Sequence, residues 1–189
     1  MDLSPMQIRN ARARDPGSIV KYLSADASRL KGVPSASFDV VFANMSLDDM
    51  VDAEGAIAEV SRVLRKGGRF VASISHPCFD VMSNSGWVAE KLISSTLVVS
   101  RKVRRYREPF SELVPWNTGK GSKSYTMGYH RPLNWYARAL NSKGLAITAL
   151  EEPAPTEEFI EKEQGQQGDL NGAGFQEVPL HLVIEAVKL

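Results

Sequence analysis

The sequence has little of what secreted, membrane-spanning or nucleic-acid-binding proteins need. It has one cysteine, Cys78, which cannot form a disulfide within the chain and suits a reducing cytoplasm. No apolar run approaches the roughly 20 residues of a membrane span, and no signal peptide is apparent. The formal net charge is +1, so charge gives no reason to expect nucleic acid or an anionic membrane as a partner. These absences favour a cytoplasmic protein, and the 43% hydrophobic content suffices for a single domain over residues 1–189.

The N-terminal half alternates helix signals with apolar strands, which is typical of an α/β protein. Ser4 and Pro5, with Gln7, predict a capped helix that runs to about Arg14. Asp52 caps a second helix with one apolar stripe, and Gly67-Gly68 is predicted to end it. Strands are predicted over residues 19–23, 38–44 and 69–75. The last two flank the second helix, and this spacing favours a right-handed parallel crossover.

The C-terminal half predicts one more helix and a closing pair of strands. Pro132 begins a helix that Gly144 ends. Strands are predicted over 145–150 and 178–187, and this pair is expected to form an antiparallel hairpin. Residues 80–130 are less regular and predict an insertion over the carboxyl edge of the sheet, where ligands bind in open α/β sheets. Residues 157–174 predict a long loop.

Several segments carry a family resemblance through their order and spacing. They are DLSP at 2–5, SADA at 24–27, FDVVFANMSLDDM at 38–50, AIAEVSRVLRKGGRF at 56–70, SISHPCF at 73–79 and YHRPLNWYARALNSKGLAITALEEPAP at 129–155. Together they resemble the successive core elements of small-molecule class I S-adenosylmethionine-dependent methyltransferases. The resemblance implies a Rossmann-like sheet, S-adenosylmethionine as cofactor and a small-molecule methyl acceptor.

The resemblance also implies roles for individual residues in cofactor binding. Asp2, with Leu3 beside it, matches the acid that ends the family's second strand and binds the ribose hydroxyls. Asp26 and Ala27 match the turn that contacts adenine. Two further residues, Asn44 and Met45, match the end of the family's fourth strand, beneath the methionine portion and the reactive methyl group. The alternative is that Asp2 and Asp26 are ordinary cap or turn acids.

The sequence departs from the family pattern in one respect. The family's first strand and its acidic, glycine-rich turn are not found, so we expect an N-terminally truncated sheet with an exposed apolar edge. The segment DLNGAG at 169–174 resembles that turn only superficially, because no apolar strand precedes it and a strand follows it. An exposed edge of this kind also favours a homo-oligomer.

Two histidines are candidates for a catalytic base, which is needed where the acceptor must lose a proton. His76 follows the third core strand and His130 precedes the last helix, although either could simply hydrogen-bond a loop. Asp48 and Asp49 could face the substrate or the solvent. No metal site is predicted.

Three other functions remain open from the sequence. The chain could be a non-catalytic module that keeps the fold, or a nicotinamide-dependent Rossmann protein, which also uses an acid at a strand end. The basic cluster at 101–107 could contact phosphates, although a solvated face is the commoner use of such a cluster.

Overall fold

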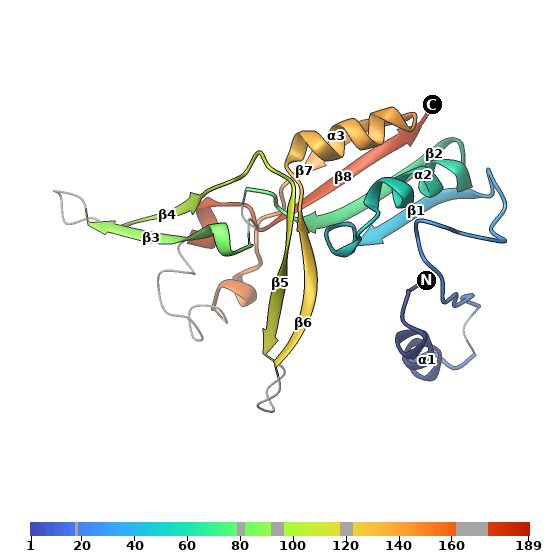
Figure 1. Ribbon diagram of the computed structural model, residues 1–189, viewed down its shortest axis with the longest axis horizontal. Helices are drawn as coiled ribbons and strands as arrows, with labels where there is room; N and C mark the ends of the chain where they lie inside the picture. The colour runs from blue at the N-terminus through green and yellow to red at the C-terminus, as the bar shows by residue number, and fades with distance from the viewer. Residues whose placement is uncertain (18, 79–81, 92–96, 118–122, 162–173) are drawn as a thin grey trace.

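A computed structural model describes residues 1–17, 19–78, 82–91, 97–117, 123–161 and 174–189. Figure 1 shows a main sheet flanked by two helices, two projecting hairpins, and an N-terminal helix set apart from the sheet. The elements are α1 (Pro5–Arg14), β1 (Phe38–Asn44), η1 (Leu47–Asp49), α2 (Ala53–Val63), β2 (Leu64–Ser75), η2 (Met82–Asn84), β3 (Ser85–Lys91), β4 (Leu97–Val103), β5 (Phe110–Asn117), β6 (Lys123–His130), α3 (Leu133–Ser142), β7 (Leu145–Glu151) and β8 (His181–Lys188).

The main sheet is mixed and has the strand order β1-β2-β8-β7. Strands β1 and β2 are parallel and are connected through α2, as the sequence predicts. Strand β8 is antiparallel to both β2 and β7. The predicted C-terminal antiparallel pair is therefore confirmed, and the architecture is a Rossmann-like α/β fold.

The core lies between the sheet and helices α2 and α3. Asp52 caps α2 by accepting a hydrogen bond from the Gly55 backbone N–H at 2.8 Å, which fixes where the helix begins. The predicted apolar stripe of α2 then packs against the sheet. The buried core includes Ile57, Val60, Phe70, Ile74, Tyr136, Leu140, Leu182 and Ile184. Burial of this stripe, rather than helix propensity alone, holds α2 in place.

The predicted end of α2 is wrong. The helix ends at Val63, and Leu64 already belongs to β2, where it pairs with Phe38. Gly67 adopts a φ of +75° inside a strand whose register shifts at this point, instead of ending the helix. A glycine pair supplies the same backbone freedom to a helix end and to a strand irregularity, so the sequence pattern fits both.

The predicted strand at 19–23 does not form. A single parallel bridge joins Asp2 to Ser24, and two backbone hydrogen bonds flank it, from Asp2 N to Leu23 O and from Ala25 N to Asp2 O. Ile19 is fully exposed. A strand needs a neighbouring strand to satisfy its backbone, and Asp2 is the bridge partner that the described residues provide here.

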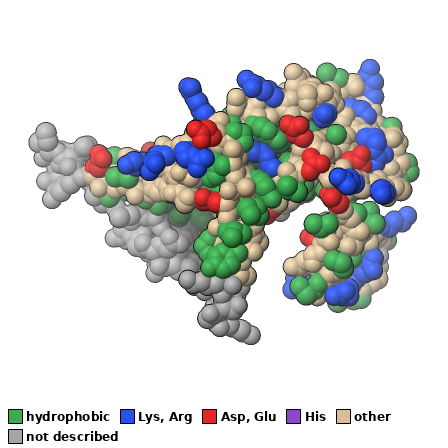
Figure 2. Space-filling view, viewed as in Figure 1, with side chains coloured by type: hydrophobic (Ala, Val, Ile, Leu, Met, Phe, Trp, Pro, Cys, Tyr) green, Lys and Arg blue, Asp and Glu red, His purple; other side chains and the backbone are tan. Residues whose placement is uncertain are grey.

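Strand β1 is the outermost described strand of the main sheet, and it exposes apolar side chains at alternate positions, which share one face. Phe38, Val40 and Phe42 are 45%, 48% and 63% exposed. Helix α1 contributes a single buried residue, Ile8, and lies apart from the sheet (Figure 1). In Figure 2 a gap separates the N-terminal segment from the hairpin region on the face shown.

Residues 80–130 contribute two antiparallel hairpins, β3–β4 and β5–β6, within their described parts. Of the predicted loop at 157–174, the described residues 157–161 and 174 are helical, so the loop prediction is wrong there; the remainder, including almost all of the DLNGAG segment, lies outside the described residues. No helix in the described part of the chain is long and apolar enough to cross a membrane.

Candidate functional site

A cavity of about 530 Å³ opens beyond the carboxyl ends of β1 and β2. One wall comes from η1 and the residues that follow β1 and β2. The other comes from η2 and the β5–β6 hairpin. Its lining is Met45, Asp48, Asp49, Ser75, Pro77, Met82, Ser83, Glu112, Leu113, Val114, Pro115, Thr126, Gly128, Tyr129, His130, Arg131 and Tyr136. This is the edge where open α/β sheets bind ligands, and the volume suits a small molecule.

Asn44 and Met45 mark the end of β1 at this cavity. The Asn44 side-chain oxygen accepts a hydrogen bond from Ser73 Oγ at 2.6 Å, and the Met45 backbone N–H donates to Ser73 O at 2.9 Å. Met45 has a φ of +44°, in the left-handed region that a non-glycine residue adopts at a cost. Met45 lines the cavity and Asn44 does not. The strand end thus aims one of the two predicted residues at the cavity.

Asp2 and Leu3 lie at the surface, beside the 24–27 turn. Asp2 Oδ1 accepts a hydrogen bond from the Ser4 backbone N–H at 2.7 Å, and the bridge to Ser24 places Asp2 next to that turn. Leu3 is 73% exposed. The structure therefore brings together the two segments that the family resemblance assigns to ribose and adenine.

Asp26 is held as a charged carboxylate. Its Oδ1 accepts hydrogen bonds from the backbone N–H and the hydroxyl of Ser28, at 2.9 and 2.8 Å. These two bonds, the backbone one first, hold the pKa of Asp26 below its ordinary value. Its Oδ2 makes no hydrogen bond within the described residues. Ala27 is partly buried against the core.

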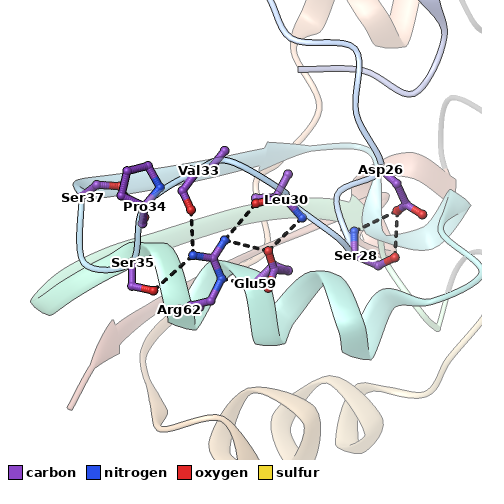
Figure 3. A network of polar contacts seen from close by, with 9 residues as sticks. All are labelled: Asp26, Ser28, Leu30, Val33, Pro34, Ser35, Ser37, Glu59 and Arg62. Atoms are coloured by element: carbon purple, nitrogen blue, oxygen red, sulfur yellow. Dashed lines mark hydrogen bonds and ion pairs between the residues drawn. The ribbon is translucent and has the colours of Figure 1, made fainter.

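The segment that follows Asp26 is anchored on α2. Glu59 accepts a hydrogen bond from Leu30 N at 2.8 Å, and Arg62 donates to the carbonyls of Leu30 and Val33 at 3.1 and 2.8 Å (Figure 3). Arg62 also pairs with Glu59 at 2.8 Å and so lowers the pKa of that carboxyl. These contacts hold the segment after Asp26 against a core helix, whereas Asp2 is held by one bridge.

His76 is buried and does not line the cavity. Its neighbours Ser75 and Pro77 do line it. Nδ1 accepts a hydrogen bond from Cys78 N–H at 3.1 Å, which places the proton of the neutral ring on Nε2. Nε2 lies 2.9 Å from Glu152 Oε1, outside good hydrogen-bond alignment. Burial lowers the pKa of His76, and the Glu152 carboxylate opposes that shift.

His130 lines the cavity and is also buried. Its Nε2 lies 2.8 Å from the Tyr106 carbonyl oxygen. Because a carbonyl only accepts, Nε2 must carry the proton, and Nδ1 is the acceptor nitrogen of the neutral ring. The ring stacks beside Phe110, with centroids 5.1 Å apart. Of the two predicted bases, His130 is the one at the cavity.

Arg131 is a site residue that sequence reasoning missed. It is 7% exposed, and its guanidinium donates to the backbone carbonyls of Leu47 and Met50 at 3.0 and 2.5 Å. It thereby fixes η1, which carries Asp48 and Asp49, against the end of β6. Its place directly after His130 was the available signal, but its partners lie about 80 residues away in sequence.

Comparisons with known proteins agree with this geometry. Residues 1–72 match the family model described as a methyltransferase domain. The chain is 42% identical over 72 residues to the malonyl-[acyl-carrier protein] O-methyltransferase of Hahella chejuensis, a match covering 38% of this chain and 25% of that protein. It is 33% identical over 82 residues to the ubiquinone/menaquinone biosynthesis C-methyltransferase UbiE of Shewanella halifaxensis, covering 42% and 32%.

The fold extends the likeness over nearly the whole chain. A crystal structure of an S-adenosylmethionine-dependent methyltransferase from Mesorhizobium loti superposes with a TM-score of 0.70 and 26% identity, covering 98% of this chain and 78% of that one. The matches to the two curated relatives above span about a quarter and a third of their lengths. The sequence match covers residues 1–72, and the fold shared over nearly the whole chain is the Rossmann-like fold of class I S-adenosylmethionine-dependent methyltransferases.

Proposed function

We propose that this protein transfers a methyl group from S-adenosylmethionine to a small-molecule acceptor held in the cavity at the ends of β1 and β2. One observation carries the proposal: Met45, the residue matched to the reactive end of the cofactor, is part of the cavity wall. The cofactor's methyl group and the acceptor would therefore meet at Met45. Residues 80–130 act as the substrate-covering part, since β5 and β6 supply one wall of the cavity.

The described residues fit the adenosine part of the cofactor. The ionised Asp26 carboxylate has one oxygen engaged by Ser28, which leaves the other able to accept from the exocyclic amine of adenine. Asp2, with Leu3 beside it, would hold the ribose hydroxyls, and Ala27 would contact the adenine base. Asn44 and Met45 would lie toward the sulfur. When bound, the cofactor supplies a methyl group activated on a sulfonium sulfur.

The protein's own task in such a reaction is alignment and, for some acceptors, removal of a proton. His130 is the proposed base, acting through Nδ1, because Nε2 is committed to the Tyr106 carbonyl. His76 has both nitrogens directed at protein groups, so its proposed part is to position the chain between Ser75 and Cys78.

Calorimetric titration with S-adenosylmethionine tests the proposal. We expect saturable binding, and we expect Asp26→Asn to weaken it by about tenfold because a charged acceptor is replaced by a neutral one. Asp39→Asn is the matched control, since Asp39 is an exposed acid near the start of β1 that pairs with Arg65. Failure of the unaltered chain to bind would overturn the proposal.

A non-catalytic module with the same fold is the second candidate. The exposed Asp2, tied to the turn by one bridge, favours it, because a weakly held ribose acid binds the cofactor weakly. Absence of cofactor binding with intact folding is the result that this candidate predicts.

The remaining proposals concern partners and location. We propose a cytoplasmic protein that does not bind nucleic acid, and the use of the basic cluster within the fold supports the second point. Arg101 lies over the Trp87 ring at 5.0 Å and donates to Ser85, while Arg105 pairs with Glu108. Self-association is supported by the exposed apolar edge of β1.

A further inference from the structure

The cavity wall has an unequal balance of charge. Three carboxylates line it, those of Asp48, Asp49 and Glu112, against the single guanidinium of Arg131. Lysine does not occur among the described residues of the lining. A group entering this cavity therefore meets a net negative potential, which disfavours an anionic substrate and favours a cationic one.

Arg131, the one cation of the described lining, is already engaged within the fold. Two of its nitrogens donate to the carbonyls of Leu47 and Met50. Both rings that flank it also lie close, with its Cζ 5.1 Å from the centre of Tyr129 and 4.8 Å from that of Trp135. With its donors on backbone oxygens and aromatic rings beside it, this guanidinium works as a structural clamp.

Asp48 provides the acceptor that the fold leaves unsatisfied. Its Oδ2 accepts from the Ser75 backbone N–H at 3.1 Å. Its Oδ1 is buried and has no hydrogen-bond partner among the described residues. A buried carboxylate oxygen without a donor is costly, so a ligand donor there gains more than it would in water. Asp48 also lines the cavity, so its carboxylate is the acceptor nearest to hand for a ligand donor bound there.

The rest of the lining is apolar and aromatic. Met45, Met82, Leu113 and Val114 give it an apolar surface, and Tyr129 adds an aromatic ring. We propose that the acceptor of this site is an amphipathic amine, whose ammonium or N–H group binds at Asp48 and whose apolar body fills the space between η2 and the β5–β6 hairpin. The proposal rests on the proposed function, since it names the substrate class of the same cavity.

Three probes that share a phenyl ring and a four-carbon chain test it: 4-phenylbutylamine, 4-phenylbutanol and 4-phenylbutyrate, titrated near neutral pH without cofactor, where the amine is cationic and the acid anionic. We expect the amine to bind about tenfold more tightly than the alcohol, and the acid more weakly still. Equal binding of amine and alcohol, preference for the acid, or no amine binding at concentrations of order millimolar would each overturn the proposal.

Two variants test whether the preference for the amine arises at Asp48. Asp48→Asn keeps an acceptor for Ser75 and is expected to lower amine affinity by about tenfold without changing alcohol affinity. Asp39→Asn removes the same charge far from the cavity and is expected to change neither. An amine preference that survives Asp48→Asn would overturn the assignment.

If Asp48→Asn does not fold, salt supplies the second test on the unaltered chain. Raising the salt to roughly 0.5 M is expected to weaken amine binding and leave alcohol binding unchanged, because ions screen the carboxylates. The loss is expected to be partial, because the Asp48 carboxylate is partly buried, and amine binding that strengthens with salt would overturn the proposal. Separate titration with S-adenosylmethionine distinguishes failure of the proposed function from failure of the amine proposal. Binding of the amine in preference to the alcohol, without binding of the cofactor, would contradict the methyltransferase activity and support the acidic cavity as an amine site.

Discussion

Replacing Arg131 by methionine is expected to destabilise the whole domain, although Arg131 lies at the cavity wall. The guanidinium joins η1 to the end of β6 through hydrogen bonds of 3.0 Å to Leu47 O and 2.5 Å to Met50 O. Methionine keeps the apolar stem of the side chain and removes every donor. The carbonyls of Leu47 and Met50 then lose a charged donor in a largely buried setting.

The size of the effect follows from those two bonds. A hydrogen bond to a charged group contributes about 1.5–3 kcal/mol, and the lost stacking on Tyr129 and Trp135 adds about 0.5–1 kcal/mol. Relaxation and water entry recover part of this, so we expect a loss of about 3 kcal/mol in the free energy of unfolding. For a chain of this size that is a fall of roughly 6–12 °C in Tm.

Urea unfolding followed by circular dichroism measures the effect, with Arg138→Met as the matched control. Arg138 is an exposed arginine on α3, so its replacement is expected to change the free energy by less than about 0.5 kcal/mol. Arg131→Lys keeps the charge but loses the planar fork, and it should fall between the two. A loss below about 1 kcal/mol for Arg131→Met would refute the role of Arg131 as the clamp of η1.

Three further predictions concern other sites. Burial holds the pKa of His76 below 6.5, so its contribution to the free energy of unfolding is fully present above pH 6.5 and is lost as the pH falls. The free energy of unfolding, measured near neutral pH and about one unit below 6.5, should show this loss, and the pH dependence should be smaller in His76→Gln. Phe42→Lys should reduce concentration-dependent sedimentation, whereas Val51→Lys, at a more exposed apolar site outside β1, should not; equal effects would argue against pairing through β1. His130→Gln should lower kcat by about 10²-fold or more with an acceptor that must lose a proton, and an unchanged kcat would exclude it as the base.

Elements governed by short-range signals were predictable from the sequence. Asp52 and Ser4 cap α2 and α1 as their positions indicate, with contacts to backbone N–H groups three residues on. The apolar stripe of α2 is buried because its 3.6-residue period matches a single covered face. The parallel β1–β2 pair and the antiparallel β7–β8 pair follow from the order and length of their connections.

Elements that depend on a distant partner were not predictable in this way. Residues 19–23 have the composition of a strand, but composition cannot supply the neighbouring backbone on which a strand depends. The role of Gly67 could not be predicted either, because a glycine with a positive φ fits the end of a helix and an irregular strand equally well.

In the candidate site, too, positions set by local sequence were predictable and contacts with distant residues were not. The strand-end position of Met45 could be read from the sequence, because it requires only the length of β1. The clamp by Arg131 could not, since its partners lie more than 80 residues away. The sequence did not show that His76 lies off the cavity either, because β2 ends at Ser75 and the strand pattern does not extend to the residue after it.

The two halves of the site differ in how firmly the fold holds them. The acceptor cavity is built by η1, the end of β2 and β6, and the buried Arg131 clamps η1 to the end of β6. The residues matched to ribose are exposed, and one bridge joins them to the turn that carries Asp26. The cavity wall is held by buried contacts of Arg131, whereas the N-terminal segment is joined to the stretch before Asp26 by exposed contacts, among them the bond from Arg12 to Tyr22 O at 2.8 Å. The acidic cavity and the cofactor site should therefore fail separately, with the cofactor site the more sensitive to substitutions between Asp2 and Asp26.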